Sequence, residues 1–164
     1  MKVRVGDFLA LLSQEAATYQ RLLDTLRDEE AALLAGRSAD VVACTSRKET
    51  LLLELRVLSE SRGLLLSRLA EYYDVPASAL TLARLADLVD QPEAAQLREA
   101  RTVLTETLSQ MAQASHRVGL LLERSLFRIR ETIRLVRESL GFAPQYDPAG
   151  RLLSPASPVL DQEA

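Results

Sequence analysis

The sequence has one cysteine, one histidine and no tryptophan among its 164 residues. A single cysteine excludes an intramolecular disulfide and a CxxC pair for metal or redox chemistry, and a single histidine excludes a histidine-rich metal site. Aromatic residues make up only 4% of the chain, while leucine, alanine, glutamate and arginine dominate it. This composition favours packed helices over a β-sandwich.

Long apolar runs and large fields of one charge are also missing. No stretch reaches the roughly 18 apolar residues of a membrane span, and the apolar run that follows Asp7 is too short for a signal peptide. The net charge is −3, and acidic residues alternate with basic ones, so no large basic surface is offered to nucleic acid. We therefore expect a cytoplasmic protein without membrane insertion or nucleic-acid binding.

The motifs of common enzyme classes are absent from the sequence as well. It contains no glycine-rich phosphate loop, no GxSxG and no HExxH. For the remaining reactive side chains we prefer a structural interpretation: His116 lies on a helix surface, and Cys44 is a small buried residue. The acidic run at 28–30 is interpreted as a solvated face rather than a metal cluster. We expect no catalytic activity, no metal and no cofactor.

Proline and glycine are scarce, and their positions divide the chain. Helix breakers occur at Gly36, Pro76, Pro92 and Gly141. They predict helices at about 7–34, 39–73, 81–89 and 92–140, in a bundle domain over 1–140 that is followed by a flexible tail over 141–164. The predicted fold is all-α: an antiparallel, coiled-coil-like bundle of three long helices and a short connecting helix, with an irregular C-terminal tail.

The first two long helices carry a heptad pattern that predicts how they pair. Within 8–33 and within 41–69, apolar residues recur in alternating steps of three and four, which is the spacing of helices packed in bundles and coiled coils. We therefore expect an antiparallel hairpin in which Leu26 lies opposite Leu51.

The same register brings together the polar residues that interrupt the two apolar seams. Glu15 then faces Arg62, and Glu29 faces Lys48. Opposite charges at matched seam positions are expected to fix the register, because a slip would place a charge against a leucine. These four residues are predicted to be register-setting seam pairs.

The third long helix is longer than its two partners and unusually apolar near its end. Part of it should therefore project from the bundle or pair with something else. Its five arginines alternate with glutamates, which indicates ion pairs along the helix rather than a nucleic-acid site. The predicted seam comprises Leu97, Leu104, Leu108, Met111, Ser115, Val118, Leu122, Ser125, Ile129, Ile133, Val136 and Leu140.

Several short patterns resemble those of the FlgN family of flagellar export chaperones. The first helix carries E-x3-Y-x2-L-L-x2-L over 15–26, and the second carries RKETLLLELRVLSESR over 47–62. The third carries SHRVGLLLERSL, similar to a family stretch that reads N-x-x-N-G-x-L-L, although Ser115 and Val118 stand where asparagine is usual. The Y-D-x-x-G of the tail, at 146–150, is similar to the family's C-terminal tyrosine and glycine. The resemblance spans about residues 7–150.

The resemblance implies a cytoplasmic chaperone for the hook-associated proteins FlgK and FlgL. Such chaperones bind the C-terminal helical segments of their clients, prevent premature assembly and deliver the clients to the flagellar export apparatus, without ATP or a cofactor. In the family, the C-terminal amphipathic part is the usual client-binding region. The chain's oligomeric state stays open at this point, including whether it forms a homodimer.

Apolar residues near the end of the chain are the candidates for client contact. They lie on the last helix and in the tail, where no further helix follows to bury them, and each of them also has a structural alternative as core. A helical coiled-coil adaptor or regulator without catalytic activity is the alternative function. The predicted partner-binding residues are Leu120, Phe127, Ile133, Val136, Leu140, Phe142 and Tyr146.

Overall fold

The structure, a computed structural model, describes residues 5–139, 145–146 and 152–153. In this part of the chain there are four α-helices: α1 (Val5–Leu34), α2 (Ser38–Tyr72), α3 (Leu82–Leu88) and α4 (Glu93–Ser139). A 3-10 turn, η1 (Ala77–Ala79), precedes α3, and the strand β1 (Gln145–Tyr146) pairs antiparallel with β2 (Leu152–Leu153). Residues 1–121 and 122–164 are two compact units.

The all-α fold expected from the sequence is confirmed, and each expected helix ends within two residues of its observed bounds. The η1 turn and the two-residue strand pair were not anticipated. The expected domain boundary at residue 140 and most of the expected tail over 141–164 lie outside the described residues.

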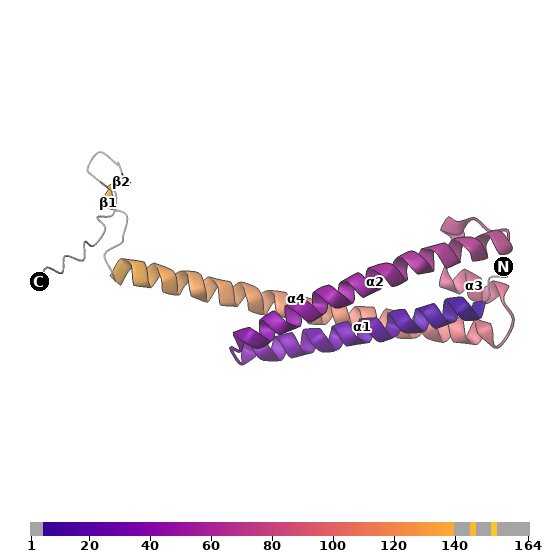
Figure 1. Cartoon of the computed structure of the whole chain (residues 1–164), viewed down its shortest axis with the longest axis horizontal. Coiled ribbons are helices and arrows are strands. Elements are labelled where there is room, and N and C mark those ends of the chain that lie inside the picture. The colour runs from indigo at the N-terminus through magenta and orange to yellow at the C-terminus, as the bar shows by residue number, and fades with distance from the viewer. Residues whose placement is uncertain (1–4, 140–144, 147–151, 154–164) are drawn as a thin grey trace, which may run out of the picture. The chain divides into compact units, whose positions relative to one another are not determined.

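The turn between α1 and α2 is made by Gly36, as the sequence indicated. Gly36 has a positive φ of 68°, a backbone conformation that costs a side-chain-bearing residue about 1 kcal/mol. The Arg37 N–H donates to the Ala32 carbonyl at 2.9 Å, and the Gly36 N–H donates to the Leu33 carbonyl at 3.2 Å. These two bonds satisfy the last carbonyls of α1 and reverse the chain, so that α2 returns alongside α1 (Figure 1).

The central helix of the unit over residues 1–121 is α1, because two of its sides are buried. Leu22 packs with Leu51 and Leu55 of α2, while its neighbour Leu23 packs in a separate cluster with Val118 of α4. Successive residues on a helix point about 100° apart, so a pair of adjacent leucines can serve two neighbouring helices. The antiparallel hairpin of α1 and α2 therefore also provides the surface on which the first half of α4 packs.

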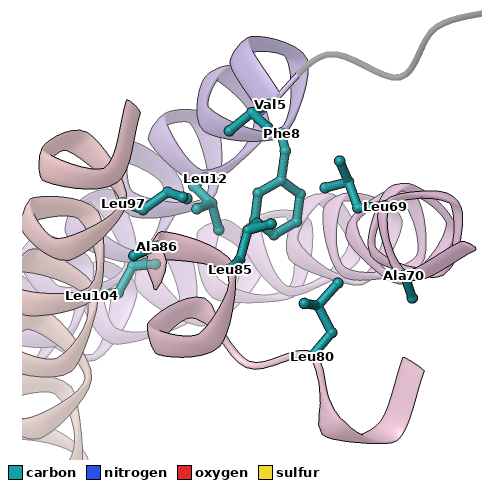
Figure 2. Packing of buried hydrophobic residues seen from close by; sticks show 10 residues of the cluster. All are labelled: Val5, Phe8, Leu12, Leu69, Ala70, Leu80, Leu85, Ala86, Leu97 and Leu104. Atoms are coloured by element: carbon teal, nitrogen blue, oxygen red, sulfur yellow. The ribbon is translucent and has the colours of Figure 1, made fainter. Parts of the chain in front are cut away.

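The largest core cluster lies where α3 meets the ends of the three long helices. Figure 2 shows Leu85 of α3 pointing toward Phe8 of α1, with Leu69 of α2 beside the ring and Leu97 of α4 nearby. The side chains of Leu85 and Leu97 are fully buried. Thr81 begins α3, as expected, and its hydroxyl accepts a hydrogen bond from the Arg84 N–H at 3.2 Å. The short helix thus closes one end of the core.

The seam predicted for the last helix is wrong at two positions. Leu108 is 43% exposed and Ser115 is exposed, whereas their neighbours Thr107 and Ala114 are buried. The sequence pattern favoured Leu108 as a seam residue because it is large and apolar, whereas Thr107 beside it is the buried residue. The positions of α4 that are buried at these turns therefore carry smaller side chains than the large apolar residues of the predicted seam.

Substitution by alanine should change the free energy of unfolding in opposite directions at two glycines, one in the turn between α1 and α2 and one within α2. A Cβ on Gly36 or on Gly63 would meet nothing within 4 Å, so only backbone preference differs between the two sites. Gly36→Ala should lower the free energy of unfolding by about 1 kcal/mol, because alanine is strained at positive φ. Gly63→Ala, in the middle of α2, should raise it by up to about 1 kcal/mol. Urea unfolding monitored by circular dichroism measures both, and equal signs would contradict the assigned turn.

Candidate helix-binding surface and its ion pairs

Glu29 of α1 is a carboxylate in the interface between α1 and α2. Glu29 is 1% exposed, and its Oε2 lies 2.5 Å from the Nζ of Lys48 on α2. Lys48 is itself largely covered. A buried carboxylate without a cation would cost several kcal/mol, so this pair ties the position of α1 to that of α2.

Glu15 is buried in the same interface, but its pairing is weaker. It is 2% exposed, and its Oε1 lies 3.3 Å from Nε of Arg62 without making a hydrogen bond. Burial raises the pKa of the Glu15 carboxyl above its usual value, and the charge of Arg62 opposes that rise. The two acidic residues therefore differ: Glu29 has a close hydrogen-bonded partner, whereas Glu15 has mainly an electrostatic one.

Both pairs expected from the sequence are thus brought together by the structure, and we propose that they set the register of the hairpin. A one-turn slip of α2 along α1 would leave each carboxylate facing an apolar seam residue. The cost of an unpaired buried charge is about 3–5 kcal/mol, which is comparable with the whole stability of many small domains. Packing of leucines alone would discriminate less sharply between registers.

Several further contacts between helices were missed by sequence reasoning. Glu54 of α2 accepts a hydrogen bond from the Thr18 hydroxyl at 2.9 Å and pairs with Arg21 at 3.1 Å. Glu30 of α1 pairs with Arg117 of α4 at 2.9 Å. Thr18 could have been found because it lies between the seam positions 15 and 22, but no local pattern indicated the partner of Arg117.

Most of the exposed large apolar residues of α4 lie from Leu120 onward. Phe127 is 65% exposed, and Leu120, Ile133 and Val136 are each between two fifths and half exposed. By helix geometry, Ile133 and Val136 share one side of α4, while Leu120 and Phe127 share the opposite side. Of the other predicted partner-binding residues, Leu140 and Phe142 lie outside the described residues, and Tyr146 is described only as part of β1.

The side of α4 that carries Ile133 continues the stripe that is buried earlier in the helix. Val118 packs against α1, and at steps of three and four residues it is followed by further large aliphatic side chains that are all exposed. We call these residues the α4 stripe. It comprises Leu122, Leu126, Ile129, Ile133 and Val136.

Of the five arginines that were expected to form ion pairs along this segment, Arg134 alone does so among the described residues. Arg134 pairs with Glu131 at 2.8 Å and with Glu138 at 4.0 Å. Both pairs join exposed side chains, and such pairs contribute at most about 0.5 kcal/mol each. They keep the segment hydrated on one flank while its aliphatic residues face solvent.

The two reactive side chains singled out in the sequence have different surroundings. His116 is exposed, and Cys44 is a buried free thiol whose sulfur accepts a hydrogen bond from Arg47 at 3.1 Å. Among the described residues, no three His, Cys, Asp or Glu side chains are grouped so that they could hold a metal ion. No helix in that part of the chain combines the length and the apolar character that crossing a bilayer requires.

Charge exchange tests whether Glu29 and Lys48 set the register. Glu29→Lys should lower the free energy of unfolding by about 3 kcal/mol or more, because it buries two like charges. The double variant Glu29→Lys with Lys48→Glu should recover a large part of that loss, since opposite charges again meet. A double-mutant cycle from urea unfolding measures the coupling. Additive losses would show that the pair does not act as a unit.

The raised pKa of Glu15 predicts a pH dependence of stability with a definite sign. The protonated carboxyl favours the folded state; this stabilisation is complete below the unfolded pKa, near 4.5, and is lost as the pH rises through the folded pKa. Glu15→Gln stays neutral, so its stability relative to the unsubstituted chain should increase as the pH rises from 4.5 toward neutrality. Arg62→Gln should make the unfolding free energy fall more steeply with pH, because it removes the charge that opposes the rise of the Glu15 pKa. Unfolding free energies across this range measure both, and a relative stability that falls with pH would refute the assignment.

Comparison with protein families places the chain in a known group. The family model described as FlgN protein matches residues 1–154, which is nearly the whole chain and includes all four helices. Searches of curated proteins and of solved structures gave no significant match. The helical fold, the long apolar last helix and this match agree with one another, and the chain belongs to the FlgN family of flagellar export chaperones.

Proposed function

We propose that this chaperone binds the C-terminal helical segments of the hook-associated proteins FlgK and FlgL in the cytoplasm. Binding would keep the clients from assembling prematurely and allow their delivery to the flagellar export apparatus. The chain would act by binding alone, without catalysis or a cofactor. Membership of the FlgN family supports the general role, and the exposed apolar surface of α4 supports the mode of recognition.

The observation that carries this proposal is the exposure of the α4 stripe together with Leu120 and Phe127 on the other side of the helix. Covering one large aliphatic side chain is worth about 1.5–3 kcal/mol. A contiguous row of such residues on a regular helix therefore offers substantial binding energy to another helix. A client that must later assemble with other apolar helices exposes a matching stripe before assembly.

Such an interface suits a chaperone because it binds without needing to be permanent. Ordering side chains and restricting two molecules costs several kcal/mol, so only part of the buried apolar surface appears as affinity. A client can consequently be released when another partner competes for its helix. The exposed ion pairs beside the stripe add solubility and little affinity.

Polar substitution on α4 tests client binding. Phe127→Gln with Ile133→Gln should weaken binding to a purified hook-associated protein by about a hundredfold or more, because two apolar contacts are removed. Helicity and the unfolding midpoint should be unchanged, since both side chains are exposed. Isothermal titration calorimetry with FlgK and with FlgL measures the affinities.

The matched control places the same polar residue at two exposed leucines away from α4. Leu34→Gln with Leu52→Gln removes comparable apolar surface from α1 and α2 and should leave the affinity within a few-fold. Equal loss in both double variants would show that the effect is general rather than local to α4. Unchanged affinity of the α4 variant would refute the proposed surface.

A further inference from the structure

The side of α2 that faces away from α1 carries a row of large aliphatic residues. Val42, Leu53, Val57 and Leu64 are each at least 62% exposed, although α2 buries Leu51 and Leu55 against α1. By helix geometry these four residues lie within about 60° of one another, on the side opposite the buried seam. We call them the α2 outer face. Exposed patches of this extent on a small protein mark interaction surfaces.

Spacing shows that the residues of the α2 outer face recur along one line of the helix, with Ser46, Glu49 and Glu60 between them. Val42, Leu53 and Leu64 are separated by eleven residues each, which is close to three full helical turns, so they stack along one line of the helix. Val57 lies one turn after Leu53 on the same line. The four residues occupy 42–64 of α2, which spans Ser38–Tyr72.

Carboxylates are interleaved with this stripe at the same interval. Glu49, Glu60 and Glu71 are also spaced by eleven residues, and all three are exposed. Glu60 pairs with Arg56 at 3.3 Å, whereas Glu49 and Glu71 make no ion pair among the described residues. By helix geometry these glutamates lie on the same line as the aliphatic residues, so the face offers alternating apolar and negative groups and suits an apolar helix that also carries positive charge.

The chain itself contains a segment of this complementary chemistry, which is the α4 stripe with its arginines. Residues 122–139 hold five arginines and three glutamates. Among the described residues Arg130 and Arg137 make no ion pair, and both lie along one flank of the α4 stripe by helix geometry. Apolar surface on both helices and unpaired charges of opposite sign make the two surfaces matched partners.

We propose that the α2 outer face binds the α4 stripe of a second copy of this chain. Each copy has both surfaces, so two copies can exchange identical contacts, which is the isologous arrangement by which most homo-oligomers close. The glutamates of α2 then lie beside Arg130 and Arg137 of the other copy. These charges fix the direction of pairing, which apolar contact alone would leave undetermined.

Self-association of this kind would occupy part of the client surface. Ile133 and Val136 belong to the α4 stripe and are also among the residues proposed to contact clients. A client and a second copy would then exclude each other, and client binding would convert dimers into one-to-one complexes. This coupling rests on the proposed function, whereas the dimer itself does not.

Sedimentation equilibrium of the full chain, without any client, tests the dimer. The unsubstituted chain should show a concentration-dependent dimer. Leu53→Glu with Leu64→Glu should weaken dimerisation by at least about a hundredfold, because glutamates would replace two central aliphatic contacts. Ile129→Glu with Ile133→Glu should weaken dimerisation to a similar extent, because it disrupts the α4 stripe, which is the other surface of the proposed contact. Leu52→Glu, an exposed leucine of α2 beside the outer face, should leave the dimer intact.

Mixing the two double variants tests which surfaces meet. Each variant alone lacks one of the two surfaces and should be monomeric, but the mixture retains one intact α2 outer face and one intact α4 stripe. It should therefore form a heterodimer held by a single contact. A monomeric unsubstituted chain overturns the proposal, as does a dimer that survives in either double variant with helicity intact. A mixture without heterodimer also overturns it, because α2 would then not bind α4.

Discussion

Two carboxylates of α1 are buried against α2, and we propose that the rest of the first unit depends on them. Glu15 and Glu29 lie in an otherwise apolar seam, and each has one particular basic residue of α2 opposite it, by a hydrogen bond for Glu29 and by charge alone for Glu15. Leucine seams permit several registers of similar energy, whereas buried charges make the wrong ones costly. Because α1 also presents Leu23 to α4, the register of the hairpin determines the surface on which α4 packs. The closing cluster around Phe8 and Leu85 requires the same alignment.

The protein combines a well-filled core with apolar surfaces that the core does not use. Leu97 and Leu85 are completely buried, whereas Ile129, Ile133 and Leu53 face solvent. Exposed aliphatic residues in such regular rows contribute nothing to the folding of the unit and carry a risk of aggregation. Their presence on two helices is understandable for a chaperone, because a chaperone binds other proteins through its surface.

Heptad spacing and helix breakers were sufficient to place the helices and to bring Glu29 opposite Lys48, because both are local properties of the chain. They failed where a neighbouring helix decides the outcome. Thr107 and Ala114 are buried by the way α4 packs on its neighbours, which a pattern of large apolar residues does not reveal, and that pattern favoured Leu108. The α2 outer face was hidden for a related reason: apolar residues on two opposite sides of a helix blur any single periodic pattern. The exposed apolar surface of α4 was recognised as an excess of apolar residues near the end of the helix, but the division of these residues between two sides of α4 was not.

The two stripes of α2 follow different repeats, and this has a consequence for its shape. The seam that faces α1 repeats every seven residues, which favours a left-handed supercoil, whereas Val42, Leu53 and Leu64 repeat every eleven, which favours a weakly right-handed one. A helix cannot coil in both directions at once. A helix bound along the outer face and α1 would therefore favour opposite supercoil directions for α2. Because the two effects oppose each other, α2 would stay nearly straight in such a complex.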